Sequence, residues 1–101
     1  MNISNNISSI QAHQTMLNSS AHNVANVNTD RFVPSDTKMT ENENSVQANV
    51  RKSDDNGSMK SQTDLSKEMT DQMITEKAVA ANVNAIKTKG DMMGSLLDIK
   101  A

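Results

Sequence analysis

Two stretches of regularly spaced apolar residues, one at each end of the 101-residue chain, constrain its fold more than any other feature. In both stretches the residues recur in alternating steps of four and three, which keeps them on one face of a helix. The N-terminal stripe is Ile3, Ile7, Ile10, Leu17, Ala21 and Val24, with Gln14 at the vacant position. The C-terminal stripe is Leu65, Met69, Gln72, Glu76, Val79, Val83, Ile86, Gly90, Met93 and Leu97. We therefore predict one amphipathic helix at each end.

The stretch between the helices, from Val33 to about Thr63, is mostly Ser, Asn, Asp, Lys and Glu and has no helical period. Alternating residues at 46, 48 and 50, followed by the turn signal Asn56-Gly57, predict at most a short β-hairpin. Such a hairpin needs a neighbouring surface, because two strands alone are rarely stable in water. The first helix is expected to end near residues 28–30, and Thr63 or Asp64 to cap the second.

The predicted fold is all-α. Two long terminal helices pack as an antiparallel coiled-coil-like pair, joined by a polar and mostly irregular linker. The ranges are 1–30 for the N-terminal helix, 31–63 for the linker and 64–101 for the C-terminal helix. The spacing alone leaves two alternatives open, an intramolecular helical hairpin and a subunit whose uncovered stripe binds neighbours. A contact that repeats head to tail without closing gives an open filament or tube.

Composition limits what this chain can do by itself. Only 35% of the residues are hydrophobic and Phe32 is the single aromatic residue, so we expect the chain to order fully only when partners cover it. The net charge is −2 and no basic run is present, which argues against nucleic-acid binding. No stretch is apolar enough to span a bilayer, and the N-terminus does not resemble a cleaved signal peptide.

The residues that usually carry catalysis or bind metal are present but not suitably spaced. Cysteine is absent, which excludes thiol chemistry and disulfides. His13 and His22 fall on roughly opposite faces of one helix, so they cannot share a metal ion. A calcium loop around Gly57 would need acidic ligands where Lys52 and Thr63 stand. We predict no enzyme activity, cofactor or metal site.

Residues 19–32, with the sequence SSAHNVANVNTDRF, resemble the N-terminal signature of the flagellar rod and hook axial protein family. In that signature a helix of small residues leads into an Asn-rich stretch, then Asn-Thr, a variable residue, Gly and Phe. The matching residues are Asn23, Ala25, Asn26, Asn28, Thr29 and Phe32. Arg31 stands where the family has Gly, which argues against a tight turn because only Gly adopts positive φ without cost.

Residues 76–100 resemble the C-terminal helix of the same family. The matching residues are Ala78, Asn82, Ile86, Thr88, Met92, Gly94, Leu96 and Leu97. Glu76-Lys77 replaces Gln-Arg, and Val79 replaces a common Tyr. The two matches together cover about half of the chain and lie in the family's order. The short linker replaces the central β domain that members normally carry, so the chain resembles a minimal member from the proximal rod.

The resemblance implies a structural subunit of the bacterial basal-body rod that polymerises through its terminal helices around the export channel. The implied partners are other rod and hook subunits, copies of itself and the flagellar type III export apparatus, which exports the protein from the cytoplasm to the periplasmic rod without a cleaved signal. The alternative is a soluble helical export chaperone or regulator that mimics axial termini. The expected assembly interface comprises Ile3, Ile7, Ile10, Leu17, Asn23, Val24, Asn26, Asn28, Thr29, Phe32, Met69, Val79, Asn82, Val83, Ile86, Thr88, Met92, Met93, Leu96 and Leu97.

Overall fold

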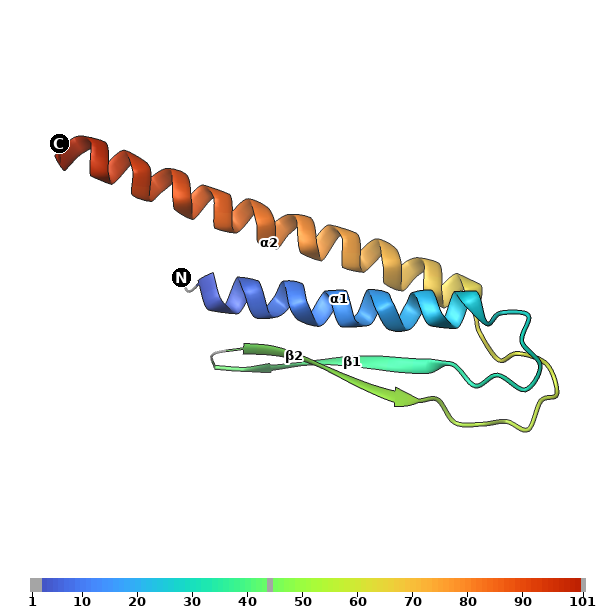
Figure 1. Cartoon of the computed structure of the whole chain (residues 1–101). Helices are drawn as coiled ribbons and strands as arrows, with labels where there is room; N and C mark the ends of the chain where they lie inside the picture. Colours follow the sequence, from blue (N-terminus) through green and yellow to red (C-terminus); the bar gives the residue numbers. More distant parts are fainter. Residues whose placement is uncertain (1–2, 44, 101) are drawn as a thin grey trace.

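Two helices and a two-stranded hairpin are arranged in three layers (Figure 1). The computed structural model describes residues 3–43 and 45–100. Its elements are α1 (Ile3–Ala25), β1 (Ser35–Asn42), β2 (Ser45–Lys52) and α2 (Leu65–Lys100). The molecule is elongated, with extents of 68 × 23 × 14 Å. The predicted terminal helices and a mostly helical chain are confirmed.

Helix α1 is the middle layer, with α2 on one side and the hairpin on the other (Figure 1). Ser20 of α1 is hydrogen-bonded to Gln72, near the start of α2, whereas Ser9 is bonded to Asn82, further along α2. The two helices therefore run in opposite directions. On the opposite side of α1, the Ser8 hydroxyl accepts a hydrogen bond from the backbone N–H of Val46 at 2.9 Å. The hairpin thus has the neighbouring surface that it requires.

The hairpin is longer than predicted and turns at a different place. Its antiparallel register pairs Ser35 with Lys52 and Asn42 with Ser45, so the chain reverses between Asn42 and Ser45. The predicted turn signal, Asn56-Gly57, instead follows β2. Gly57 has a φ of 79° there, and its N–H donates to Asp55 Oδ1 at 2.8 Å. This local turn directs the chain toward α2. Each strand has eight residues, so the hairpin takes up about half of the predicted linker, and the rest of the described linker contains no helix or strand.

The end of α1 and the start of α2 are joined by short polar contacts. Helix α1 ends at Ala25, before the predicted boundary, where the Asn26 side chain donates to the carbonyl of His22 at 2.9 Å. The Thr63 hydroxyl donates to the carbonyl of Asn23 at 3.0 Å. Carbonyls in the last turn of a helix lack partners within the helix, so these bonds satisfy them. Asp64 caps α2, as predicted, by accepting from the N–H of Ser66 at 3.1 Å.

Arg31 adopts the conformation that its sequence argued against. Its φ is 60°, in the left-handed region, and it is the only non-Gly residue with positive φ among residues 3–43 and 45–100. The neighbouring backbone is held on both sides, because the N–H of Arg31 donates to the carbonyl of Met59 and the N–H of Gln62 donates to the carbonyl of Phe32. These bonds compensate for the steric cost of an L-residue in this region.

Little of the interior is apolar. Within the described part of the chain, Ala12 is the single buried hydrophobic residue, at 4% exposure. The other buried side chains there, Pro34 apart, are polar or charged, namely those of Ser20, Asn23, Glu68 and Thr75. No helix in that part is long and apolar enough to cross a bilayer. The packing of α1 between its neighbours therefore depends on hydrogen bonds more than on buried hydrocarbon.

Candidate assembly surface

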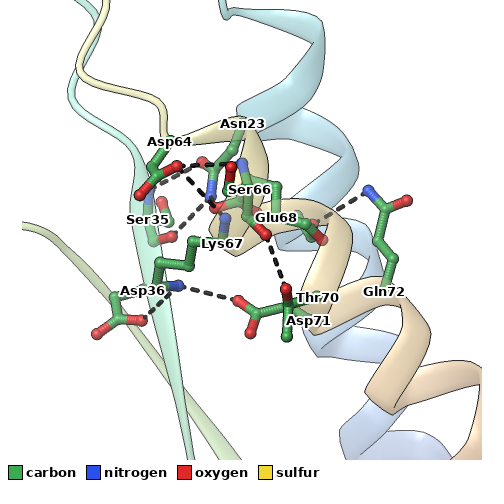
Figure 2. A network of polar contacts seen from close by, with 11 residues as sticks. Asn23, Ser35, Asp36, Asp64, Ser66, Lys67, Glu68, Thr70, Asp71 and Gln72 are labelled. Atoms are coloured by element: carbon green, nitrogen blue, oxygen red, sulfur yellow. Dashed lines mark hydrogen bonds and ion pairs between the residues drawn. The ribbon is translucent and has the colours of Figure 1, made fainter.

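Asn23 links all three layers of the molecule (Figure 2). Its side chain is only 1% exposed. The amide nitrogen Nδ2 donates to the carbonyl of Ser35 in β1 at 2.8 Å and to Glu68 Oε1 in α2 at 2.9 Å, while Oδ1 accepts from the N–H of Ser35 at 2.9 Å. A buried amide with these partners fixes the hairpin and α2 relative to α1. The sequence identified Asn23 as a site residue, and its contacts lie within the chain.

The contact between α1 and α2 continues through polar residues, of which Gln72 and Asn82 were predicted and Ser9 and Ser20 were not. The Ser20 hydroxyl donates to the carbonyl of Glu68 and accepts from Gln72 Nε2 at 3.1 Å. Asn82 donates to Ser9 Oγ at 3.0 Å. Helix α1 contains no Asp, Glu, Lys or Arg, so it offers only neutral groups to this contact. Ser9 and Ser20 fall outside the apolar spacing, so hydrophobic periodicity does not indicate their role.

The predicted apolar stripes coincide only in part with the line along which the helices meet. On α1, Ile3 and Ile7 are exposed, whereas Ile10, Leu17 and Val24 are half-buried. On α2, Val79, Asn82 and Ile86 are half-buried. The remaining predicted residues of α2 are exposed, namely Met69, Val83, Thr88, Met92, Met93, Leu96 and Leu97. Met69 and Leu97 are 63% and 65% exposed. Most of the α2 stripe therefore faces outward.

The two stripes open onto the same side of the helix pair. A groove of about 460 Å³ lies between the helices, lined on α1 by Gln14 and Leu17. Its α2 wall comprises Gln72, Thr75, Glu76, Val79 and Ala80. Five of these seven residues belong to the predicted stripes. The hydroxyl of buried Thr75 has no hydrogen-bond partner there. The helix pair thus presents one face with an apolar floor and polar edges.

The C-terminal part of α2 projects beyond α1 (Figure 1). Helix α2 has 36 residues and α1 has 23, which correspond to lengths of about 54 and 35 Å. The pairing of Ser9 with Asn82 implies that α1 runs out opposite roughly residue 88 of α2. We call residues 90–98 the overhang. Its large apolar side chains are Met92, Met93, Leu96 and Leu97, which are all more than half exposed.

The remaining predicted residues lie in the segment that follows α1. The half-buried Phe32 packs edge-on against His22, with ring centroids 5.6 Å apart. Thr29 Oγ1 donates to Asn26 Oδ1 at 2.9 Å, and both Asn28 and Thr29 are exposed. These residues shape the turn after the helix. Phe32 and Thr29 contact His22 and Asn26 at the end of α1 and not the exposed stripe of α2.

Charged groups stabilise the contact between the hairpin and α2. Lys67 Nζ lies 3.2 Å from Asp36 in β1 and 2.9 Å from Asp71 in α2. Partial burial lowers the pKa of Lys67, but the hydrogen bonds and charges of Asp71 and Asp36 outweigh it, so its pKa is raised above the ordinary value. In the loop before α2, hydrogen bonds from Gly57 and Gln62 lower the pKa of the exposed Asp55.

Among residues 3–43 and 45–100, no three His, Asp or Glu side chains are grouped so that they could hold a metal ion. The features that bear on function in that part are the polar line between α1 and α2 and the exposed apolar stripe of α2. No protein-family model matches the sequence, and no curated protein matches it significantly. The assignment of a function therefore depends on the residues and geometry described above.

Proposed function

We propose that this protein is a structural subunit of the bacterial flagellar basal-body rod and that it polymerises through its terminal helices around the export channel. In this proposal α1 and α2 pack in the assembled tube as an antiparallel coiled-coil-like pair. The neighbours that cover the pair are other rod and hook subunits or copies of the same chain. The protein reaches the periplasmic rod through the flagellar type III export apparatus, without a cleaved signal.

One observation carries the proposal, the exposure of the α2 stripe in a chain with almost no apolar core. Fully burying a Leu, Val or Met side chain is worth about 1.5–3 kcal/mol, and most of that free energy is unused when the side chain faces water. Met69, Val83 and Leu97 are each at least half exposed. A repeated contact that covers them supplies the stabilisation that the single chain lacks, as expected for a polymer subunit.

The conformation of Arg31 supports the resemblance on which the proposal rests. The family signature has Gly at this position, and Gly is the residue that adopts positive φ at least cost. In this chain Arg31 has a φ of 60°, so the position where the signature has Gly does adopt positive φ. Phe32, the next signature residue, then packs on His22 at the end of α1.

Fractionation of cells that carry the gene tests the proposal. Purified hook-basal bodies are probed with an antibody against the chain, and we expect the protein to copurify with the rod. A protein confined to the cytosol would instead favour an export chaperone or regulator that mimics axial termini. The same cells lacking the gene are expected to be non-motile and to assemble no rod beyond the missing subunit.

A pair of neighbouring substitutions makes this test specific to the stripe. Val83→Lys places a charge in the exposed stripe, so it should prevent incorporation into basal bodies and abolish swimming, because a buried unpaired charge is costly. Asn84→Lys places the same charge at the adjacent exposed position, off the stripe. This control should be incorporated like the unaltered protein. Equal incorporation of both variants would contradict assembly through the stripe.

A further inference from the structure

The contact line of α2 continues into the overhang with a change of chemistry. Positions 68, 75 and 82 face α1, and further steps of seven along this line lead to Leu96. Positions 72, 79 and 86 lead in the same way to Met93. Where α1 covers the line it is largely polar, as at Glu68, Gln72 and Asn82. Lys89 lies on the line opposite the end of α1, and after it the line carries Met93 and Leu96, which are 54% and 58% exposed.

A second exposed apolar patch lies at the other end of α2. Leu65, Met69 and Met73 follow one another at steps of four, so their side chains form a row on one face of the helix. All three are exposed. We call this row the proximal patch, and Met92, Met93, Leu96 and Leu97 the distal patch. Both patches are built from Met and Leu side chains, and the flexible thioethers of the Met residues adapt to varied neighbours.

The two patches cannot meet within one chain. Residues 69 and 97 lie on the same helix, about 42 Å apart at the usual rise. They can be brought together only between copies, and such a contact joins two different surfaces. A contact of this kind leaves one distal patch free at one end and one proximal patch free at the other, so each addition creates the site for the next. This property favours a second copy as the occupant over an unrelated helix, which would need only one patch.

We propose that the distal patch of one copy packs against the proximal patch of the next, head to tail, with the overhang lying beside the start of α2. The inference deepens the proposed function, since it names the partner and the two surfaces, and it rests on that function for its cellular setting. The contact line that α1 leaves uncovered is then completed by the neighbouring copy. The contact itself is testable without a flagellum.

The absence of cysteine allows a direct test with introduced cysteines. Met69→Cys and Leu97→Cys variants of different size, one bearing an affinity tag, are mixed in trimethylamine N-oxide, raised until the helical circular dichroism signal reaches its plateau. A short bismaleimide then links cysteines that lie close together. We expect the mixed 69–97 product to exceed the same-residue products. Ile74→Cys replaces Met69→Cys as control, because residue 74 is also more than half exposed but lies about 140° around α2 from residue 69.

The outcomes separate the alternatives. A 69–97 product at least about tenfold above the 74–97 product, and a ladder of dimers, trimers and larger species from the double variant Met69→Cys/Leu97→Cys, support the head-to-tail contact. Same-residue dimers without a ladder would indicate a closed two-fold pair and overturn it, as would equal products from the test and control pairs. If the protein is found in basal bodies but forms no 69–97 product, the proposed function stands and this contact is wrong. If the protein is confined to the cytosol but forms the ladder, the contact stands and the proposed function is wrong.

Discussion

At the scale of single residues, the fold depends on buried polar groups whose partners are specific. Asn23 bonds to two backbone groups of Ser35 and to the carboxylate of Glu68, which is itself only 2% exposed. A buried acceptor that loses its donor retains the full cost of desolvation. The stability of the three-layer arrangement should therefore be far more sensitive to Asn23 than to any exposed Asn.

Replacing Asn23 with Ala should destabilise the folded chain by about 3 kcal/mol, because Glu68 and Ser35 are left without their buried partner. The measurement is the concentration of trimethylamine N-oxide at which half of the helical circular dichroism signal is gained. Asn49→Ala is the control, since Asn49 is exposed and makes one weak bond to Thr40 at 3.4 Å. Its midpoint should stay within the change expected of a surface substitution, about 0.5 kcal/mol. Equal shifts for both variants would contradict the role given to Asn23.

Arg31→Gly should stabilise the chain by about 0.5–1 kcal/mol. The relief of the left-handed conformation is worth about 1–2 kcal/mol, and the greater freedom of Gly in the unfolded chain offsets part of it. The same folding midpoint measures the effect. Arg31→Ala removes the same charge but keeps the Cβ atom, so it should give no gain. A similar gain from both variants would place the effect in the side chain rather than in the backbone.

The roles of some single residues could be predicted from the sequence, and those of others could not. Asp64 was identifiable as a cap because its position before an apolar period is itself the signal. The roles of Ser20 and Thr75 were not, because a buried Ser or Thr has the same local pattern as an exposed one. The conformation of Arg31 was predicted wrongly, because the prediction used only the intrinsic preference of the residue. It did not include the backbone hydrogen bonds that join Arg31 to Met59 and Phe32 to Gln62.

At the scale of elements, α2 bears different surfaces toward α1, the hairpin and solvent. The heptad spacing predicted the helix correctly, yet the line that contacts α1 shares only Gln72, Val79 and Ile86 with the predicted stripe and otherwise lies beside it. The hairpin was underestimated for a related reason. Asn56-Gly57 is a strong turn signal, whereas the true reversal lies between Asn42 and Ser45, which contain no Gly. The surface of α1, which supports the strands, has no signature in the strand sequence itself.

Lys67 should stabilise the contact between the hairpin and α2 in a pH-dependent way. Its pKa is raised in the folded state, so its contribution is fully present below the ordinary value of 10.5 and is lost as the pH rises through the folded-state pKa above it. The pair is about half exposed, which limits the effect to a few tenths of a kcal/mol at physiological salt.

The measurement compares the folding midpoints of the unaltered chain and Lys67→Met at neutral pH and well above pH 10.5. The difference between them should be present at neutral pH, shrink with added salt and vanish in alkali. Arg51→Met removes a neighbouring exposed charge from β2 and should show no comparable alkaline dependence. A difference that is constant with pH would mean that Lys67 acts through packing of its alkyl chain.

Glu76→Leu should extend the exposed stripe across the groove between the helices. Glu76 lies at the edge of that groove and is exposed, so its loss removes a charge that keeps the surface soluble. We expect increased self-association by light scattering together with impaired ordered assembly. Lys77→Leu changes the next exposed residue, off the stripe, and should have a smaller effect. Unchanged assembly of Glu76→Leu would contradict a role for this position in assembly.

At the scale of the whole molecule, the long and thin shape indicates that the chain folds fully only in contact with neighbouring molecules. The chain is 68 Å long but only 14 Å thick, and Ala12 is the single hydrophobic residue among the described ones that is fully buried. The entropy of ordering a chain must be offset by burial, which this shape provides sparingly.

The isolated chain should therefore be largely unfolded in dilute buffer. Far-UV circular dichroism is expected to show little helix and no cooperative thermal transition, and the helical signal should increase with trimethylamine N-oxide or with protein concentration. A stable monomer that melts cooperatively would contradict this expectation and would favour the soluble chaperone-like alternative.

The overhang has a kinetic consequence for a chain of this kind. A subunit that gains order only against a folded neighbour finds a template at the end of an existing polymer and none in free solution. Starting a new polymer then requires two unordered chains to fold on each other, whereas extension requires only one. Growth should accordingly show a lag that preformed fragments abolish, and unassembled subunits should stay dispersed until they reach a growing end.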